Sequence, residues 1–176
     1  MKKTIYQGQK IRVTLDNVAL PDGTRHTREM VEHPGAVVVL PLLDDGRVVL
    51  ERHYRACIGA ALLELPAGTL EADEDPCECA GRELTEETGL VAKEIVHLAT
   101  FYTSPGVLTE KMHCYLARGL SRGRPALEAG EVITPVEMPF AEVLEMAATG
   151  RIEDVKTIAA IFLADSFLER ERGEGA

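Results

Sequence analysis

Residues 68–90 read GTLEADEDPCECAGRELTEETGL, a run of twenty-three residues of which eight are acidic. Asp75 belongs to the residue types that cap helix N-termini, and the proline that follows it suits the first helical position. Glu78 lies three residues after Asp75, where a capping box has its acid. Gly89 can adopt the left-handed conformation that ends many helices. The stretch therefore predicts a helix over residues 76–88.

Three acids crowd the C-terminal end of this predicted helix. Glu83, Glu86 and Glu87 are spaced i, i+3 and i+4, so they share one face. The helix dipole disfavours carboxylates there, and like charges at this spacing repel. A cation would explain them, because carboxylates without histidine or paired cysteine suit Mg²⁺ or Mn²⁺. An exposed acidic face, with charges alternating around Arg82, explains the same pattern and stays open.

The same stretch resembles the Nudix box, G-x5-E-x7-R-E-U-x-E-E-x-G-U, in which U is a bulky aliphatic residue. A match at every specified position is far more specific than a lone glycine motif. The chain is therefore similar to Nudix hydrolases, which cleave a nucleoside diphosphate linked to another moiety. The matching residues are Gly68, Glu74, Arg82, Glu83, Leu84, Glu86, Glu87, Gly89 and Leu90.

The resemblance implies roles for the residues of the box. In similar family members the carbonyl of the residue before the box glycine is a metal ligand, and that residue is Ala67. Glu83 and Glu87 would be further ligands of Mg²⁺ or Mn²⁺. Glu86 would be another ligand, direct or through water, and is a candidate catalytic group. Arg82 is expected to pair with Glu74 or Glu86 and hold the site in shape.

Composition narrows the class of protein. The chain has 176 residues, 45% of them hydrophobic, which is enough for a sizeable core. A net charge of −10 argues against a nucleic-acid polymer as partner. No apolar run is long enough to span a bilayer, and no signal core follows the N-terminus, so we expect a cytoplasmic protein. The four cysteines are expected to be reduced thiols.

Apolar runs predict the strands of the main body. Residues 36–43 (AVVVLPLL) and 47–54 (RVVLERHY) suit strands buried on both faces, and an Asp-Asp-Gly turn joins them as a hairpin. Further strands are expected at 92–102, 111–119 and 132–138. The last of these contains a proline, which favours the edge of a sheet.

Two helices are expected after the strands. Residues 140–149 form a short helix, and residues 154–170 an amphipathic one. With the resemblance, the expected fold is α/β (α+β), of the Nudix type, with a mixed β-sheet sandwiched between helices over residues 35–176. The buried stripe of the last helix is expected to contain Val155, Ile158, Phe162 and Leu168.

Residues 1–34 are expected to form an N-terminal β extension. Ile11, Val13 and Leu15 alternate with polar residues, as in a half-buried strand. The segment has too few apolar residues for a core of its own, so it needs a partner surface. ADP-ribose pyrophosphatases of the Nudix superfamily carry a similar extension that often packs across a homodimer, and the resemblance implies the same here.

Two arginines at the end of the second apolar strand are candidates for binding phosphate. Arg52 and Arg55 carry planar guanidinium groups that suit phosphate or carboxylate, although a pair of surface arginines is an equal alternative. The pattern ERHYR followed by LLELPAG is similar to the branch of the superfamily that acts on ADP-ribose and sugar nucleotides. Glu64 could contact substrate or pair with an arginine.

The loop over residues 104–110, SPGVLTE, sharpens the substrate class by resemblance. On its own it is a turn with a polar tip. A proline sixteen residues after the closing glycine of the box marks the ADP-ribose pyrophosphatase branch, and Pro105 stands there. Ser104 and Glu110 would then face the substrate.

The loop over residues 120–131 contains two candidates for the catalytic base. Related enzymes have a catalytic glutamate on the corresponding loop, often within a denser acidic run. We favour Glu128, with Glu131 second, and a purely structural role for either is equally open.

The sequence thus predicts a metal-dependent hydrolase. The expected reaction cleaves the pyrophosphate bond of ADP-ribose, giving AMP and ribose 5-phosphate, or of a related nucleoside diphosphate sugar. One alternative is another nucleotide substrate such as GDP-mannose. The other is a Nudix ligand-binding regulator that has lost catalysis, against which the intact box glutamates argue.

Overall fold

The predicted helix of the box forms in a computed structural model, which describes residues 2–127 and 130–174. Helix α1 spans Pro76–Thr88, and the Asp75 carboxylate accepts the backbone N–H of Cys77 at 2.8 Å. Gly89 has a φ of 71° and donates its N–H to the carbonyl of Thr85. Both ends of α1 are therefore capped as the sequence predicts.

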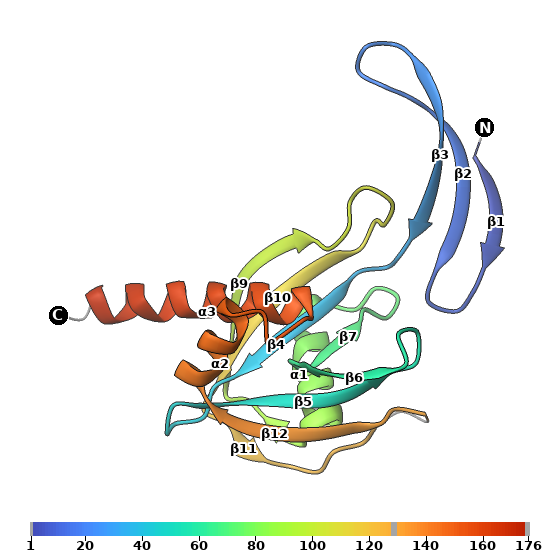
Figure 1. Cartoon of the computed structure of the whole chain (residues 1–176). Helices are drawn as coiled ribbons and strands as arrows, with labels where there is room; N and C mark the ends of the chain where they lie inside the picture. The colour runs from blue at the N-terminus through green and yellow to red at the C-terminus, as the bar shows by residue number, and fades with distance from the viewer. Residues whose placement is uncertain (1, 128–129, 175–176) are drawn as a thin grey trace.

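The central sheet has the strand order β7-β4-β10-β9 (Figure 1). Strand β4 (Ala36–Pro41) is buried along its whole length and pairs in parallel with β10 (Lys111–Arg118). Strands β9 (Glu94–Tyr102) and β7 (Ala67–Thr69) pair in antiparallel fashion at the two edges. The sheet is therefore mixed. Helix α1 covers one face, and the C-terminal helix covers the other (Figure 1).

The second sheet has the order β12-β5-β6, and it corrects the predicted hairpin. Strand β5 (Arg47–Arg55) pairs with β6 (Ala60–Glu64) and β12 (Ile133–Pro139), not with β4. The Asp-Asp-Gly turn forms, but a single bridge between Leu42 and Val48 is all that follows it. The reason is that β7 and β10 already occupy both edges of β4. Strand β12 lies at an edge, as its proline predicts.

Helices α2 (Phe140–Ala148) and α3 (Val155–Glu174) follow the last strand. The predicted buried stripe of α3 is wrong in two positions, because Val155 is 58% exposed and Phe162 is 44% exposed. The helix instead turns a face of mostly small residues toward the core, while Ile158 and Leu168 pack at its margin. The fully buried positions of α3 are Thr157, Ala160, Ile161 and Ala164.

The N-terminal segment forms a separate antiparallel sheet that projects from the body (Figure 1). Its strands are β1 (Lys3–Gln7), β2 (Arg12–Ala19) and β3 (Arg25–Glu32). Backbone hydrogen bonds of 2.7 and 3.0 Å join Val31 to Val107 and Thr109. The predicted β extension is confirmed as structure, and it is attached to the body through the loop that follows β9.

A short antiparallel pair, β8 (Leu90–Val91) with β11 (Ser121–Arg122), completes the strands. Within the described ranges, no helix is long and apolar enough to cross a membrane.

Candidate active site

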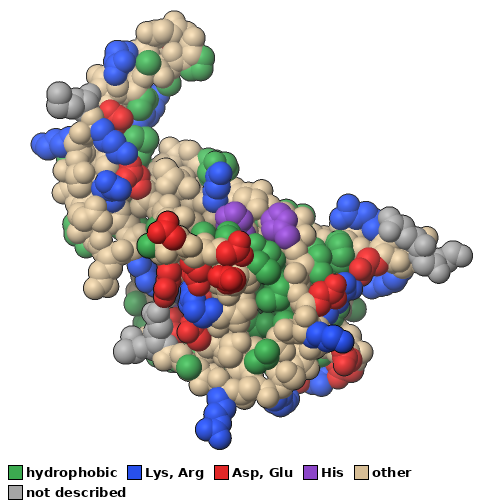
Figure 2. Space-filling model, turned by 180° about the vertical axis from the view of Figure 1, so that it is seen from behind, with side chains coloured by type: hydrophobic (Ala, Val, Ile, Leu, Met, Phe, Trp, Pro, Cys, Tyr) green, Lys and Arg blue, Asp and Glu red, His purple; other side chains and the backbone are tan. Residues whose placement is uncertain are grey.

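Arg82 is the centre of the acidic cluster on α1. Its Nε lies 2.8 Å from Oε1 of Glu74, and its Nη1 lies 2.8 Å from Oε1 of Glu83 and 2.9 Å from Oε2 of Glu86. Acidic and basic side chains gather together on this face, beneath the N-terminal extension (Figure 2). Arg82 therefore holds three carboxylates in fixed positions, where the sequence predicted a pairing with one.

Gly68 lies directly against Glu83. A Cβ atom built on Gly68 would stand 1.8 Å from Oε1 of Glu83, a distance that no two non-bonded atoms can adopt. The first glycine of the box is thus required by the path of a glutamate fifteen residues later. Burial raises the pKa of Glu83 above its usual range, which marks a carboxylate held out of water.

Glu87 points inward from the same helix. It is buried, and its Oε2 accepts the backbone N–H of Ala67 at 2.8 Å. Burial, and next to it the charge of Glu51, raises the pKa of Glu87. A cation at this point would offset both effects, so Glu87 suits a metal ligand.

Glu51 and His53 complete the site from strand β5, and neither was predicted from the sequence. The ligand atoms of Glu51, His53 and Glu87 all lie within 4.8 Å of one another. Burial, and then Glu64, raises the pKa of Glu51. Burial, and then Arg55, lowers the pKa of His53, which favours the neutral imidazole that binds metals. Alternation along β5 was the available signal, since residues 51, 53 and 55 share one face.

Arg55 and Glu64 form an ion pair with two hydrogen bonds. Nε of Arg55 lies 2.9 Å from Oε1 of Glu64, and Nη2 lies 2.6 Å from Oε2. Lys156 also pairs with Glu64. Burial opposes ionisation of Glu64, but hydrogen bonds and charge from Arg55 and Lys156 prevail and lower its pKa to about 2. Arg52 is exposed and lies at the alternate position, so its side chain leaves on the opposite face of β5.

Two cavities meet beside the box. The larger, of about 540 Å³, contains Gly68, Arg82 and Glu83 in its wall, with Lys10 from the turn between β1 and β2. The smaller, of about 300 Å³, lies between the loop after β9 and the start of α3. Both are lined by Arg55, Ala67, Gly68 and Thr69, so a ligand could extend from one into the other.

The loop over residues 104–110 contributes to the smaller cavity through one of its two predicted residues. Glu110 lines this cavity and accepts a hydrogen bond of 2.6 Å from Oγ1 of Thr103. Ser104 is exposed, and its carbonyl accepts the N–H groups of Val107 and Leu108 at 3.1 and 2.9 Å. Thr103 and Lys156 also line the smaller cavity and were missed, because only the tertiary fold brings them together.

The two candidates for the base have different outcomes. Glu131 lines the larger cavity together with Glu83, and its charge acts on Glu51, Glu83 and Glu87. Glu128 lies outside the described residues. Its predicted role therefore stays a prediction.

Fold and site together define a class: an α+β protein with a mixed sheet between helices and a carboxylate cluster suited to a divalent cation. The orphaned Oε1 of the buried Glu51, which has no hydrogen-bond partner among the described residues, supports that suitability. The model of the NUDIX domain matches residues 32–161. The chain belongs to the Nudix family.

Curated relatives align with most of the chain. It is 38% identical over 159 residues to the methanol dehydrogenase activator of Bacillus methanolicus, covering 89% of this chain and 86% of the relative. It is 37% identical over 162 residues to the ADP-ribose pyrophosphatase of Bacillus subtilis, covering 91% and 88%. It is 36% identical over 144 residues to the GDP-mannose pyrophosphatase of Escherichia coli O139:H28, covering 76% and 75%.

A solved structure supports the fold. The crystal structure of an ADP compounds hydrolase superposes with a TM-score of 0.84 and 22% sequence identity, covering 97% of this chain and 93% of that one. The predicted mixed sheet between helices, with its N-terminal extension, is therefore a known arrangement of the whole chain.

Proposed function

We propose that this protein is a Nudix pyrophosphohydrolase that cleaves the pyrophosphate bond of ADP-ribose or a related nucleoside diphosphate sugar. The observation that carries the proposal is the pair of cavities that meet at Arg55 and Gly68, beside the carboxylates of the box. Such a shape suits a ligand with a group at each end of a diphosphate. The relatives named as pyrophosphatases for ADP-ribose and GDP-mannose support the same class.

The residues of the site have separate roles in the proposal. Glu83, Glu87 and the Ala67 carbonyl would hold Mg²⁺ or Mn²⁺, with Glu86 as a further ligand or catalytic group. When bound, the cation neutralises the diphosphate and makes its phosphorus a better electrophile. Arg55 already donates two hydrogen bonds to Glu64. Its remaining N–H groups would orient a phosphate.

Proton transfer is assigned to the loop after β11. Glu131 would take the proton of the attacking water as the oxygen adds to phosphorus and the bridging P–O bond breaks. Its position in the wall of the larger cavity supports this role, and Glu128 stays the alternative. With ADP-ribose as substrate, the products are AMP and ribose 5-phosphate.

The far end of the substrate is assigned to the smaller cavity. Glu110, which lines it, would contact the terminal ribose, and Ser104 would approach from the same loop. Arg52 lies on the other face of β5, away from the two cavities. It would contact substrate only if a second subunit placed its substrate against that face. GDP-mannose is the second candidate substrate, favoured by the relative named for it.

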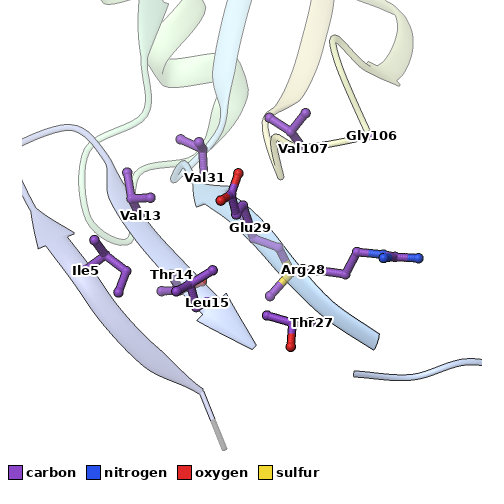
Figure 3. Close-up of a pocket in the computed structure, with 11 residues that line it drawn as sticks. Ile5, Val13, Thr14, Leu15, Thr27, Arg28, Glu29, Val31, Gly106 and Val107 are labelled. Atoms are coloured by element: carbon purple, nitrogen blue, oxygen red, sulfur yellow. The ribbon is translucent and has the colours of Figure 1, made fainter. Parts of the chain in front are cut away.

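We also propose that residues 1–34 make a homodimer, and that the protein is cytoplasmic. The extension exposes apolar side chains around a hollow of about 720 Å³, lined by Ile5, Val13 and Leu15 together with Val107 from the body (Figure 3). An apolar hollow between two parts of one chain suits a second copy of the extension. The Nudix hydrolase domain would then be residues 35–176.

The test is release of phosphate from a panel of nucleotides, coupled to a phosphatase, with Mg²⁺ and with Mn²⁺. The panel contains ADP-ribose, GDP-mannose, UDP-glucose, a dinucleoside polyphosphate and a nucleoside triphosphate. ADP-ribose well ahead supports the proposal, and similar rates for all sugars indicate a broad nucleoside diphosphate sugar hydrolase. No turnover of any member by folded protein overturns it in favour of a binding protein.

A further inference from the structure

Glu51 on β5 is a buried carboxylate with one oxygen that lacks a hydrogen-bond partner among the described residues. It lies opposite Glu64 in the pairing with β6, and opposite Pro135 in the pairing with β12. Its side chain is 1% exposed, and Oε1 has no hydrogen-bond partner in the part of the chain that the structure describes. A buried polar atom without a partner costs on the order of 1–3 kcal/mol. Such an atom in a stable fold calls for an explanation, and a bound ion supplies one.

Two further ligand groups converge on the Glu51 carboxylate. His53 is two residues along β5 and therefore on the same face, and Glu87 comes from α1 on the other side. One ligand atom from each of the three residues lies within 4.8 Å of the others. The N–H of Ala67 fixes the Glu87 carboxylate at 2.8 Å, so that ligand is already oriented.

We propose that Glu51, His53 and Glu87 bind a second divalent cation, deeper than the cation of the Nudix box and distinct from it. The box cation would use Glu83 and the Ala67 carbonyl on the outer side of Glu87, among carboxylates that Arg82 holds. Glu87 would be the bridge between the two. The inference rests on the proposed function only in assuming that Glu87 also binds the cation of the box.

The ligand set predicts which cation binds. A site of two carboxylates and one imidazole is a mixed oxygen and nitrogen site, and imidazole suits transition metals. Mg²⁺ prefers oxygen ligands and keeps several of its waters, for which the buried surroundings of Glu51 and Glu87 have little room. The deeper site should therefore select Mn²⁺ or a later transition metal over Mg²⁺, while the box accepts either.

The experiment is a titration of metal-free protein with Mn²⁺ alone. Binding is measured by calorimetry and by the electron paramagnetic resonance signal of free Mn²⁺. The wild-type protein should show two binding events, of which excess Mg²⁺ competes well with only one. Glu51→Gln and His53→Gln should each weaken the event that resists Mg²⁺ by about tenfold to a hundredfold. Glu83→Gln should weaken the other.

The matched control is His26→Gln on strand β3, which removes an exposed histidine far from the site. It should leave both binding events unchanged. If Glu51→Gln does not fold, the His53→Gln variant alone decides. Unchanged Mn²⁺ binding in a folded His53→Gln variant overturns the inference, as does a single binding event in the wild type.

These outcomes are separate from those of the substrate panel. A protein that turns over nothing can still bind Mn²⁺ at Glu51 and His53, which would leave the inference standing and overturn the proposed function. If the protein cleaves ADP-ribose and its His53→Gln variant binds Mn²⁺ like the wild type, the proposed function stands and the inference is overturned.

Discussion

Gly68 and Glu83 are so close that a side chain at residue 68 would displace the glutamate: a Cβ atom there would lie 1.8 Å from the Glu83 carboxylate oxygen Oε1 and 1.9 Å from Cδ. All three close atoms belong to the Glu83 side chain, and none to backbone. The contact therefore constrains where one carboxylate points, and leaves the course of the main chain free.

Gly68→Ala should displace Glu83 and weaken metal binding without unfolding the protein. The flexible glutamate can swing away from the new methyl group, so we expect a change of less than about 1 kcal/mol in the free energy of unfolding. Loss of one oriented ligand should reduce metal affinity by about tenfold to a hundredfold. The measurements are chemical denaturation and calorimetric titration with Mn²⁺. Full metal affinity in the variant would show that Glu83 is not a ligand.

Arg82→Lys should loosen the same carboxylates, because Arg82 holds them in place. Lysine keeps the charge but cannot hold Glu74, Glu83 and Glu86 at once, because that requires the forked guanidinium. We expect turnover to fall by at least about tenfold and to be partly recovered at high metal concentration, since the ligands are loosened and not removed. The check is turnover against metal concentration. Arg122→Lys, on an exposed ion pair, is the control.

The sequence predicted the part of the site that lies on one helix. The caps of α1 and the common face of Glu83, Glu86 and Glu87 depend only on the spacing of residues along one helix. The tertiary fold does not change that spacing. Glu51 and His53 were missed because their burial depends on β5 lying between β6 and β12, a pairing distant in sequence. The predicted hairpin paired β5 with β4. That pairing gave no reason to expect one face of β5 to lie toward α1.

The stripe on α3 failed for a related reason. Large apolar residues such as Val155 and Phe162 fit a helical period, but most of the residues that α3 buries completely are small, among them Ala160 and Ala164. Thr157 is buried because Oγ1 accepts the N–H of Leu65 at 2.8 Å. Neither effect can be read from a hydrophobic pattern.

The ion pair between Arg55 and Glu64 predicts a loss of stability in acid. The pKa of Glu64 in the folded protein is about 2, below its usual 4.5, so the ionised carboxylate stabilises the fold. That contribution is complete above about pH 4.5 and is lost as the pH falls toward about 2, and it should be on the order of 2 kcal/mol. The wild type should therefore lose more free energy of unfolding over this interval than Glu64→Gln does. Parallel curves for the two proteins would contradict the assignment.

Divalent cations should stabilise the folded protein through Glu87. A ligand that binds only the folded state, at one hundred times its dissociation constant, adds about 2.7 kcal/mol to the free energy of unfolding. Glu87→Gln should lose most of this gain, because it removes an anionic ligand that is fixed by Ala67. Thermal unfolding with Mn²⁺ and with a chelator measures the difference. Glu78→Gln, an exposed acid in the first turn of α1, should keep the full gain.

The proposed homodimer can be tested with two neighbouring residues of β1. Ile5 is 51% exposed and lines the hollow under the extension, while Tyr6 is 57% exposed and is not among the lining residues. If a second copy fills that hollow, Ile5→Asp buries a charge in the interface and should shift the protein to monomers at micromolar concentration. Tyr6→Asp should leave the dimer intact. Sedimentation velocity distinguishes the two, and a wild-type protein that is already a monomer would reject the proposal, leaving the hollow as a feature of a single chain.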